Sequence, residues 1–140
     1  MQRETVEAIS RNLYREFGSG YKIYPDIPKQ GLEEPCFYIH PLPVKHEQKL
    51  GTAYRREQSF DIHYFPKEEQ SSKELSDTEE RLYSCMEYIT LGEKLYRGKE
   101  MKAEVRDGVL HFMVDYDIPL RRIEEPDAYM EELEVEGMMK

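Results

Sequence analysis

The chain has 140 residues, of which 39% are hydrophobic and 35% charged, and 29 acidic residues against 20 basic ones give a net charge of −9. This length suits a single domain that buries a core without disulfides or metals. A negative field repels phosphate backbones and anionic lipids, so we expect neither direct nucleic-acid binding nor membrane attachment. We find no basic apolar leader and no long apolar run, which predicts a soluble, intracellular protein.

The first predicted element is an amphipathic helix over residues 4–18. One of its faces carries four apolar side chains at spacings of three and four residues: Val6, Ile9, Leu13 and Phe17. Gly18 is a natural stop for this helix, because glycine readily adopts the left-handed conformation that ends many helices.

Three strands are expected next. A short one covers 21–24, and an aromatic and β-branched one follows over 36–42, after a segment rich in proline. Residues 44–51 carry charges and a glycine, and we expect them to form a connecting loop. The third strand is long and covers 54–65, where Pro66 stops it.

The long strand has two unlike faces, because successive side chains of a strand point to opposite sides. A shift of one residue would bury several charged groups, so the alternation predicts which face meets the core. The core-facing residues are Phe60, Ile62 and Tyr64. The residues expected to face water or a neighbouring subunit are Arg55, Glu57, Ser59, Asp61 and His63.

A second helix and a hairpin are expected in the remaining sequence. The start of the helix has the spacing of a capping box, at Ser71 and Glu74 or at Ser76 and Glu79. Apolar residues then recur at near-helical intervals up to Gly92. Alternating residues on both sides of the turn 106–108 predict a two-stranded hairpin.

These elements predict an α+β single domain: a largely antiparallel sheet of about four to five strands, with two main helices packed on it. We place the domain at residues 1–123. Residues 124–139 contain seven acids and no base, so 124–140 is expected to be an acidic C-terminal tail that adds little to folding.

The sequence offers no complete set of catalytic or metal-binding residues. Asp61 and His63 share one face and could form half of a metal site, but a third ligand from His40 or His111 would need a strand pairing that the sequence does not give. We therefore expect no catalytic residues, no metal and no cofactor. Cys36 and Cys85 are expected to be buried, reduced thiols.

Two segments resemble the tail terminator family of long-tailed bacteriophages and related prophage elements. They are "YKIYPDIPKQGLEEPCFYIHPL" (21–42) and "YRREQSFDIHYFP" (54–66), with a strand ending in "YPD", a "PCF" entry to the next strand and an "SFDIHYFP" strand. The preceding helix, and the helix and hairpin that follow, fall in the family's order.

The resemblance implies a structural protein rather than an enzyme. Such a subunit forms a ring, with six as the expected number of copies, on the end of the tail tube, stops tube polymerisation and offers a surface for head joining. Its partners would be other copies of itself, the tail tube protein and a head-completion protein. It would occur in the bacterial host cytoplasm during assembly and in the virion tail, and Arg55, Glu57, Asp61 and His63 are candidate interface residues.

Two other classes of protein remain open from the sequence. One is another head–tail connector or tail-completion subunit of similar fold. The other is an unrelated cytoplasmic enzyme or regulatory binding domain, which would require a concave pocket with perturbed titratable groups.

Overall fold

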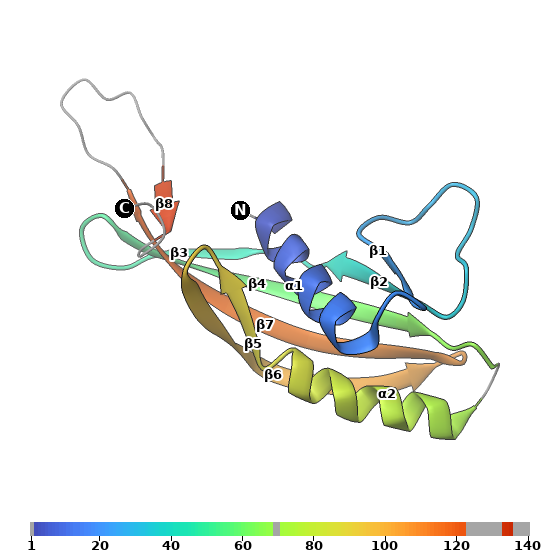
Figure 1. Ribbon diagram of the computed structural model, residues 1–140. Helices are drawn as coiled ribbons and strands as arrows, with labels where there is room; N and C mark the ends of the chain where they lie inside the picture. Colours follow the sequence, from blue (N-terminus) through green and yellow to red (C-terminus); the bar gives the residue numbers. More distant parts are fainter. Residues whose placement is uncertain (1, 69–70, 123–132, 136–140) are drawn as a thin grey trace.

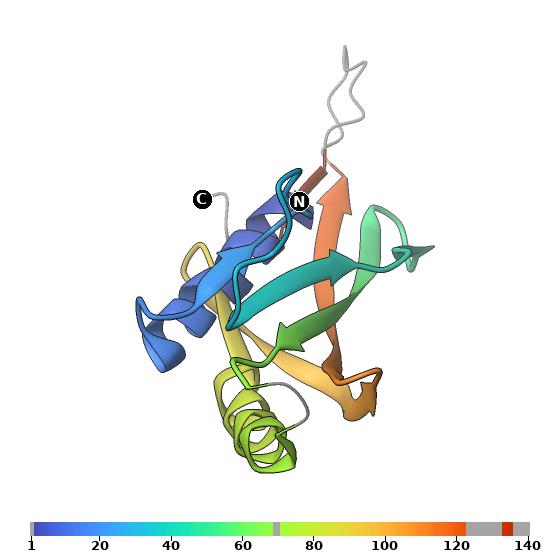
Figure 2. The ribbon, with the colours of Figure 1, turned by 90° about the vertical axis from the view of Figure 1, so that its right-hand side faces the viewer.

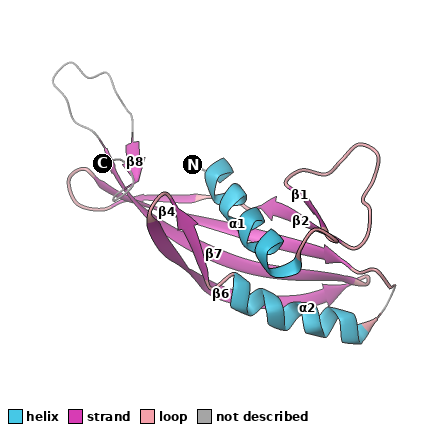
Figure 3. Cartoon of the chain, viewed as in Figure 1, coloured by secondary structure: helices cyan, strands magenta, loops and turns pink. Residues whose placement is uncertain are grey.

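The computed structural model describes residues 2–68, 71–122 and 133–135. These residues form two helices and eight strands (Figures 1 and 3). In chain order the elements are α1 (Gln2–Phe17), β1 (Lys22–Tyr24), β2 (Cys36–Pro41), β3 (Lys45–Gln48), β4 (Ala53–Phe65), α2 (Ser72–Cys85), β5 (Tyr88–Leu91), β6 (Lys94–Arg106), β7 (Val109–Arg122) and β8 (Leu133–Val135).

All eight strands belong to one mixed, curled sheet, seen from two directions in Figures 1 and 2. The strand order is β1-β2-β4-β7-β6-β5, while β3 pairs with β4 and β8 pairs with β7. Only β1 and β2 are parallel; the other described pairs are antiparallel. The α+β class is confirmed, but the expected four to five strands are too few, because short strands at the sheet margins have weak sequence patterns.

The long pair β4–β7 forms the centre of the sheet. Its register runs without interruption from Ala53 opposite Arg121 to Tyr64 opposite Leu110. The residues predicted to face the core are fully buried, as are Leu110, Phe112 and Val114 across the pair. The predicted two-faced strand is therefore confirmed on its apolar side: Phe60, Ile62 and Tyr64.

Both helices cover the same face of the sheet (Figures 1 and 2). The predicted apolar stripe of α1 is buried, and Gly18 ends this helix with φ +86°. Helix α1 also lies against the outer strand β5: Asn12 donates to the carbonyl of Tyr88 at 2.7 Å and Arg11 to that of Thr90 at 3.1 Å. These bonds occupy edge carbonyls that another chain could otherwise pair with. No described helix is long and apolar enough to cross a lipid bilayer.

Two sequence-based expectations are wrong. The segment predicted as a loop contains β3, which pairs with the first half of β4 although its residues are polar, because the partner strand supplies its hydrogen bonds. The second helix ends at Cys85 rather than near Gly92, and residues 88–91 instead form β5, whose aromatic and β-branched side chains favour a strand. Ser71 is the N-cap of this helix, where its hydroxyl accepts a bond from the N–H of Glu74 at 3.2 Å.

The predicted hairpin is β6–β7. Its turn consists of Asp107 and Gly108, both at positive φ (51° and 77°), as a two-residue type I′ turn requires. Beyond β7, β8 lies within the segment expected to be the acidic tail and pairs with residues 120–122 of β7. The other residues of 124–140 lie outside the described residues, and the domain boundary at 123 stays a prediction.

Candidate functional site on the open face of the sheet

The four candidate interface residues lie on the side of the sheet that faces away from α1 and α2, which we call the open face. The strand register places each of them opposite a residue of β7. The facing pairs are Arg55 with Pro119, Glu57 with Asp117, Asp61 with Met113, and His63 with His111.

One part of the open face is a charge ladder, which we define as Glu47, Arg55, Asp117 and Lys99. Arg55 lies 3.4 Å from Glu47 Oε1 and 3.9 Å from Asp117 Oδ2, and Lys99 Nζ lies 2.6 Å from the same Asp117 oxygen. The ladder therefore joins four strands, β3, β4, β7 and β6, with alternating charge. Because Arg55, Glu47 and Lys99 are partly exposed, these ion pairs orient the side chains more than they stabilise the fold.

Glu47 is the most heavily paired acid of the ladder. Lys49 lies 3.2 Å and Lys45 3.5 Å from its carboxylate oxygens. The hydrogen bond and charge of Lys49, followed by the charges of Lys45 and Arg55, hold the pKa of Glu47 below its usual value of 4.5. Glu47 therefore stays ionised at neutral pH, and the ladder keeps its alternating charge.

The other part is a histidine cluster, defined as Asp61, His63 and His111. His63 Nε2 and His111 Nδ1 each lie 3.2 Å from Asp61 Oδ2, and the centroids of the two imidazole rings are 4.2 Å apart. Burial alone would raise the pKa of Asp61, but the two rings outweigh it, so that this pKa lies below its usual value of 3.8. The cluster thus holds an ionised, nearly buried carboxylate between two imidazoles.

Aromatic side chains of β2 border the histidine cluster. The Tyr38 ring stands almost perpendicular to His63 with centroids 5.3 Å apart, and its hydroxyl lies 3.1 Å from His40 Nδ1. His40 faces Asp61 in the register, and its ring is 5.9 Å from that of His63. This border leaves the side chains of Asp61 and His63 only 11% and 19% exposed.

The four candidate residues therefore separate into two pairs. Arg55, with 42% of its side chain exposed, and the half-buried Glu57 reach the surface, whereas Asp61 and His63 are mostly covered. A contact between this side of β4 and another protein would be made mainly by Arg55 and Glu57. The interface role itself stays a prediction.

The members of the site that come from β6 and β7 do not stand out in the sequence. Asp117 and Lys99 were not singled out, and His111 was only one of two possible third ligands. A signal was present, since His111, Asp115 and Asp117 share one face of the alternating strand 109–118. The register that brings them beside β4 is absent from the local pattern.

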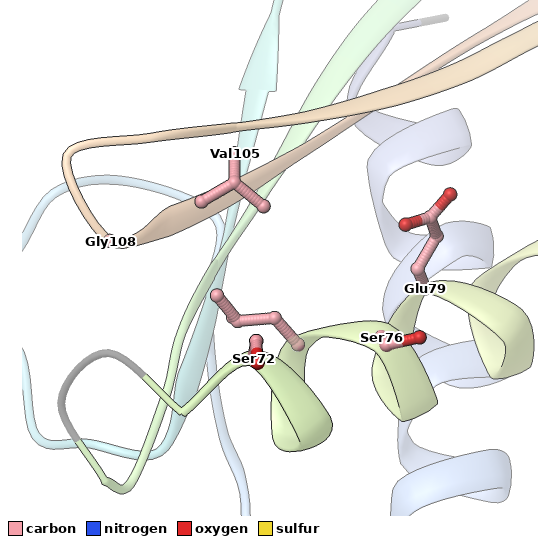
Figure 4. A pocket seen from close by; sticks show the side chains of 6 residues that line it. Ser72, Ser76, Glu79, Val105 and Gly108 are labelled. Carbon is pink, nitrogen blue, oxygen red and sulfur yellow. The ribbon is translucent and has the colours of Figure 1, made fainter.

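A hollow of about 400 Å³ lies between the first turns of α2 and the β6–β7 hairpin. Figure 4 shows the side chains that line it. Its apolar lining includes Leu75 and Val105, and Val105 is 52% exposed. The polar lining residues are Ser72, Ser76 and Glu79, whose carboxylate accepts a bond from Tyr83 at 3.2 Å. No histidine, cysteine or lysine lines the hollow among the described residues.

The two cysteines are free thiols, as predicted. Burial raises the pKa of Cys36 to about 11 and that of Cys85 to about 12. Both thiols are therefore protonated at neutral pH and are poor nucleophiles. Cys36 is fully buried and Cys85 partly buried.

No curated protein sequence matches the chain. A family model described as phage tail terminator protein matches residues 4–128, from the first turn of α1 to beyond the end of β7. The match covers most of the chain and agrees with the resemblance found in its strands. The chain thus belongs to the phage tail terminator protein family and is a structural component of a phage tail.

Proposed function

We propose that this protein is the subunit of a ring, with six copies, that caps the end of the tail tube, stops tube polymerisation and provides the surface to which the head is joined. The observation that carries the proposal is the family match over residues 4–128. Assembly would take place in the cytoplasm of the bacterial host, and the subunit would remain in the virion tail. Catalysis is not part of the proposed role.

The charge ladder supports the ring contact. A ring is built from heterologous contacts, in which one surface of a subunit meets a different surface of the next. The ladder presents both signs of charge on a partly exposed surface, and charges arranged in this way fix the register of a contact more than they add affinity. We infer that Arg55 and Glu57 face the neighbouring subunit.

Two exposed loops support contacts with the tail tube protein and with a head-completion protein. The turn between β3 and β4 carries Leu50, and the β1–β2 connection carries Ile27; these side chains are 87% and 66% exposed. The two loops lie towards opposite ends of the sheet in Figure 1. A subunit that joins a tube to a head needs two such separated surfaces.

Electron microscopy of tails assembled with and without the protein tests the proposal. Tails made without it should be overlong and carry no heads, and adding the purified protein during assembly should restore a uniform length. Tails of normal length in its absence would disprove the role in termination. Normal length together with loss of heads would point to a head–tail connector instead.

Ring formation has its own test. The isolated protein should be a monomer or a weak oligomer, because closure is favoured once the tube holds several subunits near one another. Light scattering at several concentrations, with and without tail tube protein, measures this. A stable closed dimer under both conditions would contradict the ring.

A further inference from the structure

The histidine cluster contains three potential metal ligands from two adjacent strands. We propose that Asp61, His63 and His111 bind a divalent transition metal of the zinc class, with water completing the coordination. The proposal concerns the single chain and does not depend on ring formation.

The two distances from the carboxylate to the imidazoles fit a tetrahedral ion. Zinc bonds to imidazole nitrogen and carboxylate oxygen are about 2.0–2.1 Å long, so adjacent ligand atoms of a tetrahedron lie roughly 3.3 Å apart. Asp61 Oδ2 lies 3.2 Å from both His63 Nε2 and His111 Nδ1. All three ligand atoms lie within 4.8 Å of one another. The two imidazole nitrogens must approach to the same separation of roughly 3.3 Å when the ion binds.

Unsatisfied polar atoms also point to a ligand. Within the described part of the chain, Asp61 Oδ1 and His63 Nε2 are buried and have no hydrogen-bond partner. His63 Nε2 is close to the carboxylate but is not aligned to donate to it. Buried polar atoms without partners are rare in native proteins, and an ion between these groups would satisfy them.

The supporting structure is rigid. Asp61 and His63 are two residues apart on β4 and share one face, and His111 faces His63 directly from β7. The backbone hydrogen bonds between β4 and β7 therefore fix the positions of all three residues. The Tyr38 ring packs edge-on against His63 and restricts its rotation. Ligands held by paired strands lose little conformational entropy on binding an ion.

No metal is expected from the sequence, because the sequence does not place a third ligand near Asp61 and His63. The β4–β7 register provides His111 from 50 positions beyond Asp61. Two histidines and one carboxylate, with an open position, form a ligand set that zinc, cobalt and nickel all accept. The proposal departs from that expectation, and the binding experiment decides between them.

Titration of the full-length, untagged protein with Co²⁺, followed by its visible absorption, and with Zn²⁺, followed by calorimetry, tests the site. We expect one ion per chain, visible bands typical of tetrahedral cobalt and a higher melting temperature when the ion is bound. His111→Asn and Asp61→Asn should each weaken binding by roughly 100-fold or more, since even changes outside the ligand set reduce affinity by about 10–100-fold.

His46→Asn is the matched control, because His46 lies on β3, where it contacts Arg56 and stacks on Tyr54. It should bind the ion like the wild type. Circular dichroism without metal establishes that each variant is folded. If a ligand variant is unfolded, the wild type still decides: bound Co²⁺ must shift the NMR signals of the His63 and His111 rings far more than those of His46. No stoichiometric binding, equal loss in His46→Asn, or cobalt shifts that are larger at His46 than at His63 and His111 would each overturn the proposal.

Discussion

The hydroxyl of Tyr64 donates a hydrogen bond to Glu74 Oε2 at 2.5 Å, which ties the end of β4 to the first turn of α2. The same carboxylate accepts bonds from the backbone N–H groups of Lys67 at 2.7 Å and Glu68 at 3.1 Å. Glu74 thus fixes the direction in which the chain leaves the sheet and enters the helix. It also satisfies the hydroxyl of a tyrosine that is otherwise in the core.

Glu74 predicts a pH dependence of stability. Burial alone would raise its pKa, but the bonds from Tyr64, Lys67 and Glu68 lower it below the usual 4.5. A group whose pKa is lower in the folded state contributes stability above its unfolded pKa and loses it as the pH falls through the folded one. The wild type should therefore lose part of its free energy of unfolding as the pH falls below about 4.5.

Replacing Glu74 with Gln removes this contribution. The variant should be less stable at pH 7 by about 1.5–3 kcal/mol, the range for hydrogen bonds to charged groups. Its stability should also fall less steeply between pH 5 and 3, as measured by urea unfolding in steps of pH. Glu80→Gln, an exposed change on the same helix, is the control. A Glu74→Gln profile parallel to the wild type would contradict the assignment.

A side chain at position 98 would clash with its neighbours. A Cβ at this position would lie 2.5 Å from the carbonyl oxygen of Met86 and 3.0 Å from Val114 Cγ2. The Gly98 N–H also donates to Glu87 at 2.7 Å, so the backbone cannot move away freely. Gly98→Ala should lower the free energy of unfolding by about 1–3 kcal/mol.

Gly20→Ala is the matched control for this substitution, because no atom lies within 4 Å of its added Cβ. Urea midpoints of the two variants measure the difference. Equal stability of the two alanine variants would show that the contact between Gly98 and Met86 is looser than the structure indicates.

Ile62 tests the core assignment of β4. Its side chain is fully buried between Ile39 and Phe112 of the neighbouring strands. An aspartate there would place an unpaired charge in an apolar core, at a cost of more than about 4 kcal/mol, a large fraction of the roughly 5–15 kcal/mol that stabilises an ordinary domain. Ile62→Asp should lack cooperative unfolding by circular dichroism, whereas Ile27→Asp, in an exposed loop, should fold normally. A folded Ile62→Asp protein would refute the assignment.

Arg55 tests the ring contact. Arg55→Glu breaks two partly exposed ion pairs, each contributing about 0.2–1 kcal/mol, so the subunit should stay folded. It places a fourth acid beside Glu47, Glu57 and Asp117, which should prevent a neighbouring subunit from docking and give overlong tails in micrographs. Lys73→Glu makes the same charge change on α2 and should terminate tubes normally. Tails of normal length with Arg55→Glu would show that Arg55 faces water rather than a neighbouring subunit.

Truncation tests the domain boundary. Removal of 124–140 takes away β8, a three-residue strand that pairs only with the end of β7. The melting temperature of the truncated subunit should stay nearly unchanged, while tube capping should be lost. Differential scanning calorimetry measures the first effect and electron microscopy the second. A large fall in melting temperature would place this segment in the folded domain.

Local patterns predicted the elements whose side chains alternate clearly. The stripe of α1 and the two-faced strand β4 were both identified, because burial on one side selects residues at a helical or a strand period. The same rule failed for Ile89, which fits a helical spacing after Leu82 but lies in β5. The spacing of apolar residues does not tell where α2 ends when the strand that follows is also apolar.

The sequence by itself determined which side of β4 faces the core and that Asp61 and His63 share the other side, since both follow from the two-residue period of a strand. Only the tertiary structure decided what lies beside them. His111 reaches the cluster and Asp117 reaches Arg55 through the β4–β7 register, which is set by the packing of the whole sheet against both helices. Long-range pairing leaves no mark on the local pattern of either strand, so neither the charge ladder nor the histidine cluster could be assembled from sequence alone.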